Sequence, residues 1–123
     1  MKLRLNGNAL RLRLNQAEVG HLSKTGYVES TTEFGPGSSL SYILETSTKT
    51  LALQVVLQNG DIRVRVPVAD AQDWITTERV EIAGEQQLDT GKKLSILIEK
   101  DFQCIHKEHK DPGAFPNPLS QGA

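Results

Sequence analysis

The sequence predicts an α+β fold, in which about seven strands form a curved antiparallel β-sheet or a partly closed barrel with one or two short helices. Short runs of alternating apolar and polar residues recur along the chain, and Asn-Gly or Gly-Pro-Gly turns separate several of them. Two segments have helical signals, which is too few for the strand–helix–strand units of a parallel sheet. We therefore expect tight antiparallel connections.

The length and composition fit one domain. The chain has 123 residues, of which 37% are hydrophobic and 24% are charged, so a disordered or fibrous chain is excluded. We assign residues 1–118 to a single α+β domain and residues 119–123 to a flexible C-terminal tail. No internal repeat is apparent.

The charge is balanced. A net charge of −1 gives no general attraction to nucleic acid or to an anionic membrane, and we expect neither as a partner. Arginines interrupt the N-terminal run where a secretory signal needs an apolar core, and no window is long enough to span a membrane. We expect a cytoplasmic protein, and the lone Cys104, which cannot form an internal disulfide, is in keeping with this.

The first third of the chain predicts a hairpin, a helix and an edge strand. Leucines alternate with basic residues over 2–5 and 10–14, and Asn6-Gly7 between them predicts a hairpin turn, although a bulge in one long strand also fits. Asn15 and Glu18 form a capping-box pattern, and Gly26 supplies the helix stop. Residues 27–34 then alternate as an exposed or edge strand.

The rest of the chain predicts further strands and one more helix. Strands are expected over 40–45 and 50–58, and the nearly continuous apolar run LALQVVLQ favours a central strand for the second. Asn59-Gly60 predicts a hairpin to a strand over 61–66. A short helix over 68–75 carries Trp74. Strands over 79–83 and 93–101 complete the sheet.

One candidate site is a group of soft and borderline metal ligands after the last strand. Cys104, His106 and His109 have a spacing that zinc could use, but no second Cys or His pair completes a four-ligand set. Cys104 beside His106 is also a hypothetical thiolate–imidazole pair. We expect instead that Cys104 is buried, that both histidines are exposed and that Phe115 is partly buried against the sheet. No cofactor is expected.

The second candidate site consists of arginines on two amphipathic strands. Arg11 and Arg13, and likewise Arg63 and Arg65, lie on the polar faces, where guanidinium groups could hold a phosphate or carboxylate if the faces converge on a concavity. The alternative is ordinary cross-strand pairing with carboxylates. The acids considered for this pairing are Glu29, Glu33, Glu45 and Glu81.

A further charged triplet, Glu99-Lys100-Asp101, ends the last strong strand. Alternation sends Lys100 to the face opposite its neighbours, which argues against an acid–base set. We expect these charges to be solvated.

Several segments resemble a small bacterial protein family known as a domain of unknown function. The similar segments are MKLRLNGNALRLRLNQAEV, EFGPG, VRVPVADAQDW, IEKDFQC and FPNP. The resemblance implies a single-domain bacterial protein of this length and brings no activity, cofactor or catalytic residue with it. Cys104 matches the family's pattern, whereas the segment up to Phe115 varies and has no fixed histidine pair. The resemblance therefore argues against a metal site formed by Cys104, His106 and His109.

We predict a non-enzymatic cytoplasmic binding or interaction module, whose partner is an unknown protein or a second copy joined through a sheet edge. One alternative is an anion- or phosphate-binding barrel or enzyme that uses the arginine-rich strand faces. The other is a metal-binding protein that uses Cys104, His106 and His109.

Overall fold

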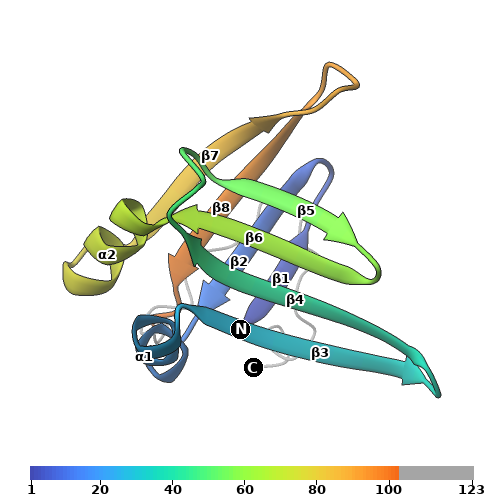
Figure 1. The fold of residues 1–123 in the computed structure, drawn as a ribbon, viewed down its shortest axis with the longest axis horizontal. Helices are drawn as coiled ribbons and strands as arrows, with labels where there is room; N and C mark the ends of the chain where they lie inside the picture. Colours follow the sequence, from blue (N-terminus) through green and yellow to red (C-terminus); the bar gives the residue numbers. More distant parts are fainter. Residues whose placement is uncertain (103–123) are drawn as a thin grey trace, which may run out of the picture.

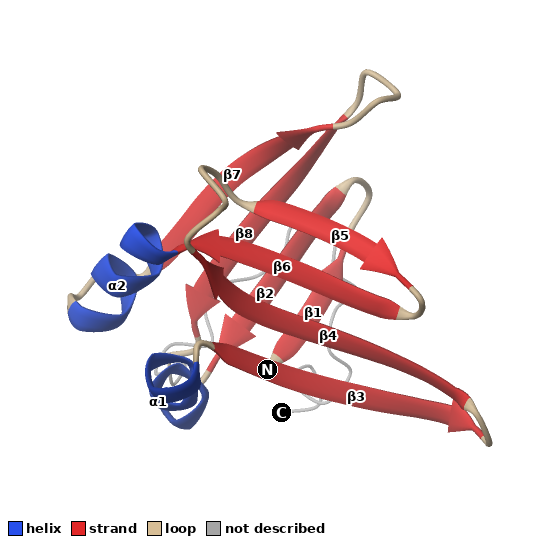
Figure 2. Ribbon diagram, viewed as in Figure 1, coloured by secondary structure: helices blue, strands red, loops and turns tan. Residues whose placement is uncertain are grey.

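The computed structural model describes residues 1–102, which form eight strands and two helices, so the predicted α+β class is confirmed (Figures 1 and 2). The elements in chain order are β1 (Lys2–Leu5), β2 (Ala9–Leu14), α1 (Gln16–Thr25), β3 (Tyr27–Gly35), β4 (Ser38–Ser47), β5 (Gln54–Gln58), β6 (Asp61–Pro67), α2 (Val68–Thr76), β7 (Glu81–Gln87) and β8 (Lys93–Lys100). The predicted sites at Cys104, His106, His109 and Phe115, and the tail 119–123, lie outside the described residues.

The strands form two separate four-stranded sheets. Sheet A has the order β1-β2-β8-β7 and sheet B the order β3-β4-β6-β5. The outer pairs of each sheet are antiparallel, whereas the central pairs β2/β8 and β4/β6 are parallel. Figure 1 shows one sheet behind the other with strands that cross steeply, and both helices at one end. The expected single antiparallel sheet or partly closed barrel of about seven strands is not what forms.

The two sheets share one core. Alternate residues of β2 and β6 are buried, as their apolar–polar alternation predicts. The buried side chains that meet between the sheets include Leu10, Leu12, Leu14, Ile96 and Ile98 from sheet A and Leu44, Ile62, Val64 and Val66 from sheet B. Burial of each such side chain contributes about 1.5–3 kcal/mol of transfer free energy. The arginines at the intervening positions therefore face outward.

The chain contains an internal repeat that the sequence analysis missed. Residues 2–47 and 54–100 each form a hairpin, a helix and a second hairpin, and each half gives one hairpin to each sheet. Arg13 pairs with Glu99 in the parallel pair of sheet A, and Arg65 pairs with Glu45 in that of sheet B. The halves are thus related by an approximate two-fold arrangement, in which β1, β2, α1, β3 and β4 correspond to β5, β6, α2, β7 and β8.

The N-terminal hairpin and helix form as predicted. Asn6 donates its N–H to the carbonyl of Ala9, and Gly7 has a φ of 57°, so this segment is a hairpin turn and not a bulge in one strand. The Asn15 side chain accepts from the Glu18 N–H, and the Glu18 carboxylate accepts from the Asn15 N–H, each at 2.9 Å. These caps fix the start of α1.

The second helix is anchored by its tryptophan. Trp74 is fully buried, and its indole N–H donates to the carbonyl of Val80 at 2.9 Å. Lys100 lies over the indole ring, with Nζ 5.7 Å from the ring centroid, and donates to the Thr77 carbonyl. Lys100 therefore points away from its neighbour Glu99, as alternation predicts.

The apolar run LALQVVLQ does not form a central strand. β5 begins at Gln54 and lies at the edge of sheet B, and Leu51 in the preceding loop is 98% exposed. The side-chain amide of Gln86 in β7 accepts from the Val55 N–H at 2.7 Å and donates to the Val55 carbonyl at 3.3 Å. The Gln86 side chain thus pairs with the edge backbone of β5. In a closed barrel, the backbone of a neighbouring strand would take this position.

Neither described helix is long and apolar enough to cross a membrane.

Candidate functional site: charged outer faces of the two sheets

The Glu99 cluster, formed by Arg11, Arg13 and Glu99, lies on the outer face of sheet A. Both arginines donate Nε–H to the same carboxylate oxygen of Glu99, at 2.7 and 2.8 Å. Glu99 belongs to β8, a central strand, and its side chain is only 11% exposed. The cluster thus holds a nearly buried carboxylate with two charge-assisted hydrogen bonds.

The Glu99 cluster contradicts the expectation of a solvated strand end. The missing information was the parallel pairing of β2 with β8, which places Glu99 beside Arg13 although the two are far apart in sequence. Arg11 and Arg13 therefore pair with Glu99, which was not among the acids expected to pair with them. The sequence did contain one signal of this burial, since Glu99 shares a strand face with the apolar residue Leu97.

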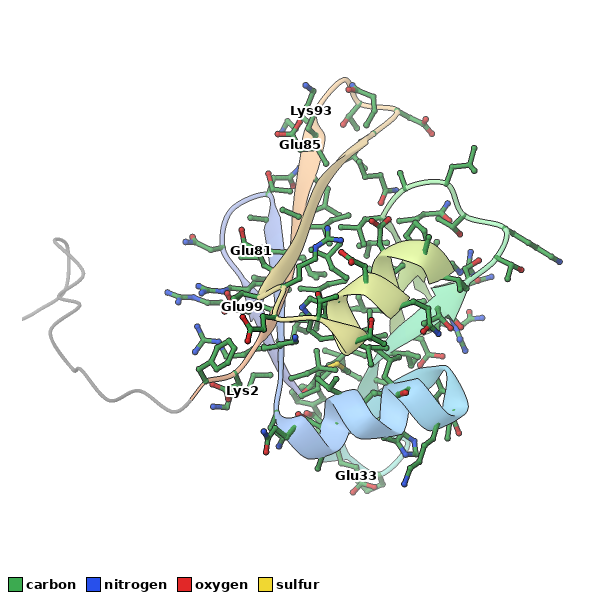
Figure 3. All side chains as sticks on the ribbon, turned by 90° about the vertical axis from the view of Figure 1, so that its left-hand side faces the viewer. Lys2, Glu33, Glu81, Glu85, Lys93 and Glu99 are labelled. Atoms are coloured by element: carbon green, nitrogen blue, oxygen red, sulfur yellow. The ribbon has the colours of Figure 1, made fainter. Side chains whose placement is uncertain are left out.

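The basic ridge, formed by Lys2, Arg4, Arg11 and Arg13, follows β1 and β2 and surrounds a small pocket of about 130 Å³. Lys2 pairs with Asp101 at 3.0 Å, and Arg13 lies 4.0 Å from the same residue. Figure 3 shows Lys2, Glu99 and Glu81 on the same side of the molecule. Arg4 is exposed and has no ion pair with any acid among residues 1–102.

A shallow groove of about 680 Å³ lies next to the ridge on the outer face of sheet A. Its floor includes Ala9, Leu97 and Ala83 from three neighbouring strands, and Arg4 and Arg11 line it on one side. On the far side, Glu85 is paired with Lys93 at 3.5 Å. The groove therefore combines an apolar floor with cations concentrated on the β1–β2 side.

The Glu45 cluster, formed by Arg63, Arg65 and Glu45, occupies the equivalent position on sheet B. Arg65 Nε donates to one carboxylate oxygen of Glu45 at 3.2 Å, and Arg63 Nη1 lies 3.5 Å from the other. The Glu45 side chain is 25% exposed. This cluster is looser than its equivalent on sheet A, and it borders an open pocket of about 440 Å³.

The structure brings each arginine pair together but separates the two pairs. Arg11 and Arg13 face outward from sheet A, and Arg63 and Arg65 face outward from sheet B. The four predicted ligand-binding arginines therefore do not line one concavity. They form two separate clusters, one around Glu99 and one around Glu45, and Glu45 was among the acids considered for pairing.

A cavity of about 960 Å³ lies between the start of α1 and the end of α2. Among its polar groups, Asn15 is used in the helix cap and Lys100 is bonded to Thr77. Phe102, the last described residue, lies at its rim. The Asn15 side chain and Lys100 therefore stabilise the fold, whereas Gln16 and Glu78 in the same lining are exposed.

Within residues 1–102, no group of three or more His, Cys, Asp or Glu side chains is arranged to hold a metal ion. The predicted metal ligands Cys104, His106 and His109 lie beyond this part of the chain.

The fold and its surfaces define a small, internally duplicated α+β domain with charged outer sheet faces. The chain belongs to DUF7009, a family of unknown function, whose model matches residues 1–119. This match confirms the resemblance to a family of unknown function, while bacterial origin stays a prediction. No curated protein and no solved structure gave a match.

Proposed function

We propose that this protein is a non-enzymatic binding module and that the outer face of sheet A docks an acidic, extended segment of a partner protein. The observation that carries the proposal is the exposed Arg4, which has no acidic partner among residues 1–102 and borders the 680 Å³ groove. A carboxylate of the partner would complete its ion pair.

The charge distribution supports this choice of partner. The basic ridge has four cations, and the acids that pair with it are Glu99 and Asp101. A surplus of positive charge therefore remains along β1. Such a surplus steers an acidic segment toward the ridge and disfavours a basic one.

The backbone of β1 supports an extended partner. Asn6 bonds to Ala9 across the turn, and bonded pairs alternate along an antiparallel ladder, so Arg4 faces Arg11 as the next bonded pair. The N–H and C=O groups of Leu3 and Leu5 consequently point to the open edge of sheet A. A partner strand paired with them would have alternate side chains beside Lys2 and Arg4.

The groove supplies an apolar component. Ala9, Leu97 and Ala83 are small or partly exposed, so they leave a shallow surface next to the cations. This floor belongs to β2, β8 and β7, so apolar side chains of the acidic segment outside the strand paired with β1 would cover it. Purely electrostatic binding would be weaker and more sensitive to salt.

The test is a titration with a labelled ten-residue peptide of alternating Glu and Val, followed by amide chemical shifts. We expect saturable shifts at Leu3, Leu5 and Leu97, with affinity that falls as salt rises. R4E should weaken binding at least about tenfold, because it reverses the charge beside the groove. K24E, which reverses an exposed cation in α1 that belongs to neither proposed site, is the matched control and should leave it unchanged.

Three results would contradict the proposal. They are an absence of shifts on sheet A, equal binding of a Lys–Val peptide, and equal loss of affinity in both variants.

Self-association through a sheet edge is the second candidate. β3 is a nine-residue edge strand with Phe34 71% exposed, and no described side chain covers its outer edge as Gln86 covers β5. However, antiparallel self-pairing centred on Thr31 would oppose Glu29 and Glu33 of two copies, which is unfavourable. Native mass spectrometry tests this candidate: a dimer that Thr31→Pro abolishes would favour it, and a monomer at tens of micromolar would exclude it.

A further inference from the structure

We propose that the Glu45 cluster forms part of a second binding site, which takes a small oxyanion such as a phosphate or carboxylate group. The site is on the outer face of sheet B, so it is independent of the surface proposed for an acidic partner. Either proposal can fail without the other.

The site is a pocket of about 440 Å³ at the carboxyl ends of the parallel strands β4 and β6. Arg63 and Arg65 line one side, and Ser47 at the end of β4 and Lys49 and Thr50 in the following loop line another. The Thr50 hydroxyl donates to Ser47 Oγ at 3.1 Å, which leaves the Ser47 hydroxyl free to donate to a ligand. Most of these groups are hydrogen-bond donors or cations. The pocket has the dimensions of a small-molecule site and the chemistry of an anion site.

The arginines retain donors that no described group uses. Arg65 donates Nε–H to Glu45, and its terminal nitrogens form no hydrogen bond within residues 1–102. Arg63 makes contacts of 3.5 Å to Glu45 and 4.0 Å to Asp61, both longer than a good charge-assisted hydrogen bond. A planar guanidinium with unused N–H groups can bind two oxygens of a phosphate or carboxylate.

Lys49 adds a cation without a described partner. It is exposed in the loop between the two halves and forms no ion pair within residues 1–102. The pocket therefore has three cations, against one carboxylate in its lining from Glu45 and a second, Asp61, at 4.0 Å from Arg63. A ligand with two negative charges would be attracted more strongly than one with a single charge.

The equivalent arginines on sheet A are less available to an external anion than those on sheet B. There, both arginines bind one oxygen of Glu99 at 2.7 and 2.8 Å, and the adjoining pocket is about 130 Å³. On sheet B, Glu45 is held at 3.2 and 3.5 Å beside a pocket more than three times as large. Glu45 is thus the weaker competitor for its arginines, and an external anion can take its place.

The test is a titration with inorganic phosphate, followed by amide shifts of the full chain at constant ionic strength. We expect saturable shifts at Ser47, Lys49 and Thr50. A parallel titration with malonate, a dicarboxylate, distinguishes the two kinds of oxyanion. The titrant that binds with the higher affinity shows whether the site prefers a phosphate or a carboxylate group. Sodium chloride at matched ionic strength should give no saturable shifts.

Three variants make the test specific. Glu45→Gln removes the competing carboxylate and should tighten phosphate binding roughly threefold or more, because both guanidinium groups become available. Lys49→Met should weaken it roughly fivefold or more, since one cation is lost. Lys92→Met, the matched control, removes an exposed cation between β7 and β8 that lies in neither proposed site, and it should have no effect.

The proposal is overturned if no anion gives saturable shifts on sheet B. It is also overturned if Glu45→Gln weakens binding, or if Lys92→Met and Lys49→Met have equal effects, since general ion binding would explain either. The unliganded amide spectra show whether each variant is folded, so a folding defect cannot be mistaken for lost binding.

Discussion

The Glu99 and Glu45 clusters have the same register but different properties. In each, two arginines of one strand face a glutamate of the neighbouring parallel strand. Yet the Glu99 side chain is 11% exposed and the Glu45 side chain 25%, and the closest arginine contacts are 2.6 and 3.2 Å. A repeated local sequence has therefore produced one tight ion cluster and one open one.

The edge strands beside the two arginine pairs also differ. In sheet A, Lys2 and Arg4 of β1 are the register partners of Arg13 and Arg11, and Lys2 pairs with Asp101. In sheet B, Gln54 and Val56 of β5 take those positions and carry no charge. The two Arg-x-Arg patterns therefore lie beside edge strands of different charge.

The largest expected effects test whether the halves fold as one unit. Leu12→Ala in β2 and Val64→Ala in β6 remove fully buried, equivalent side chains from the shared core. We expect losses of about 3 and about 2 kcal/mol, because the larger side chain leaves the larger cavity. Urea unfolding followed by Trp74 fluorescence and by circular dichroism should give one coincident transition. Separate transitions would show that the halves are independent.

The next effect compares the two acids directly. Glu99→Gln should lower the free energy of unfolding by about 2 kcal/mol, because it leaves two arginines around a nearly buried neutral group. Glu45→Gln should cost less than about 1 kcal/mol, since its contacts are longer and more exposed. Urea midpoints of the two variants measure the difference. Equal losses would mean that the clusters are energetically alike.

A smaller effect concerns the edges that the two sheets expose. Gln86→Ala should cost about 1–2 kcal/mol and speed hydrogen exchange at the Val55 amide, because its side-chain partner is lost. Gln87→Ala removes an exposed amide that bonds to Gly91 and serves as the control. Unchanged exchange at Val55 would indicate that Gln86 does not protect the β5 edge.

The local features of the fold were predictable from the sequence. The Asn15–Glu18 capping box, the hairpin at Asn59-Gly60 and the Trp74 helix depend on residues close in the chain, and all three formed. The alternation of β2 and β6 likewise identified their buried faces. Such patterns report backbone geometry and burial within one element.

The arrangement of the sheets was not predictable in the same way. Alternation shows that a strand has one buried face, but it does not identify its neighbours, so the parallel pairs β2/β8 and β4/β6 were missed. The edge position of β5 depends on the same long-range pairing. The repeat escaped notice although LRLRL over 10–14 and IRVRV over 62–66 follow similar turns. The role of Glu99 was not predicted because it depends on the pairing of β2 with β8.

The equivalent Glu99 and Glu45 clusters differ in tightness, and we propose that the first holds sheet A together whereas the second binds an anion. Double-mutant cycles for Arg13–Glu99 and Arg65–Glu45, measured by urea unfolding, test it most directly. We expect a coupling energy of about 1.5 kcal/mol or more for the first pair and below about 0.5 kcal/mol for the second. Equal coupling energies, or a stronger Arg65–Glu45 pair, would contradict it.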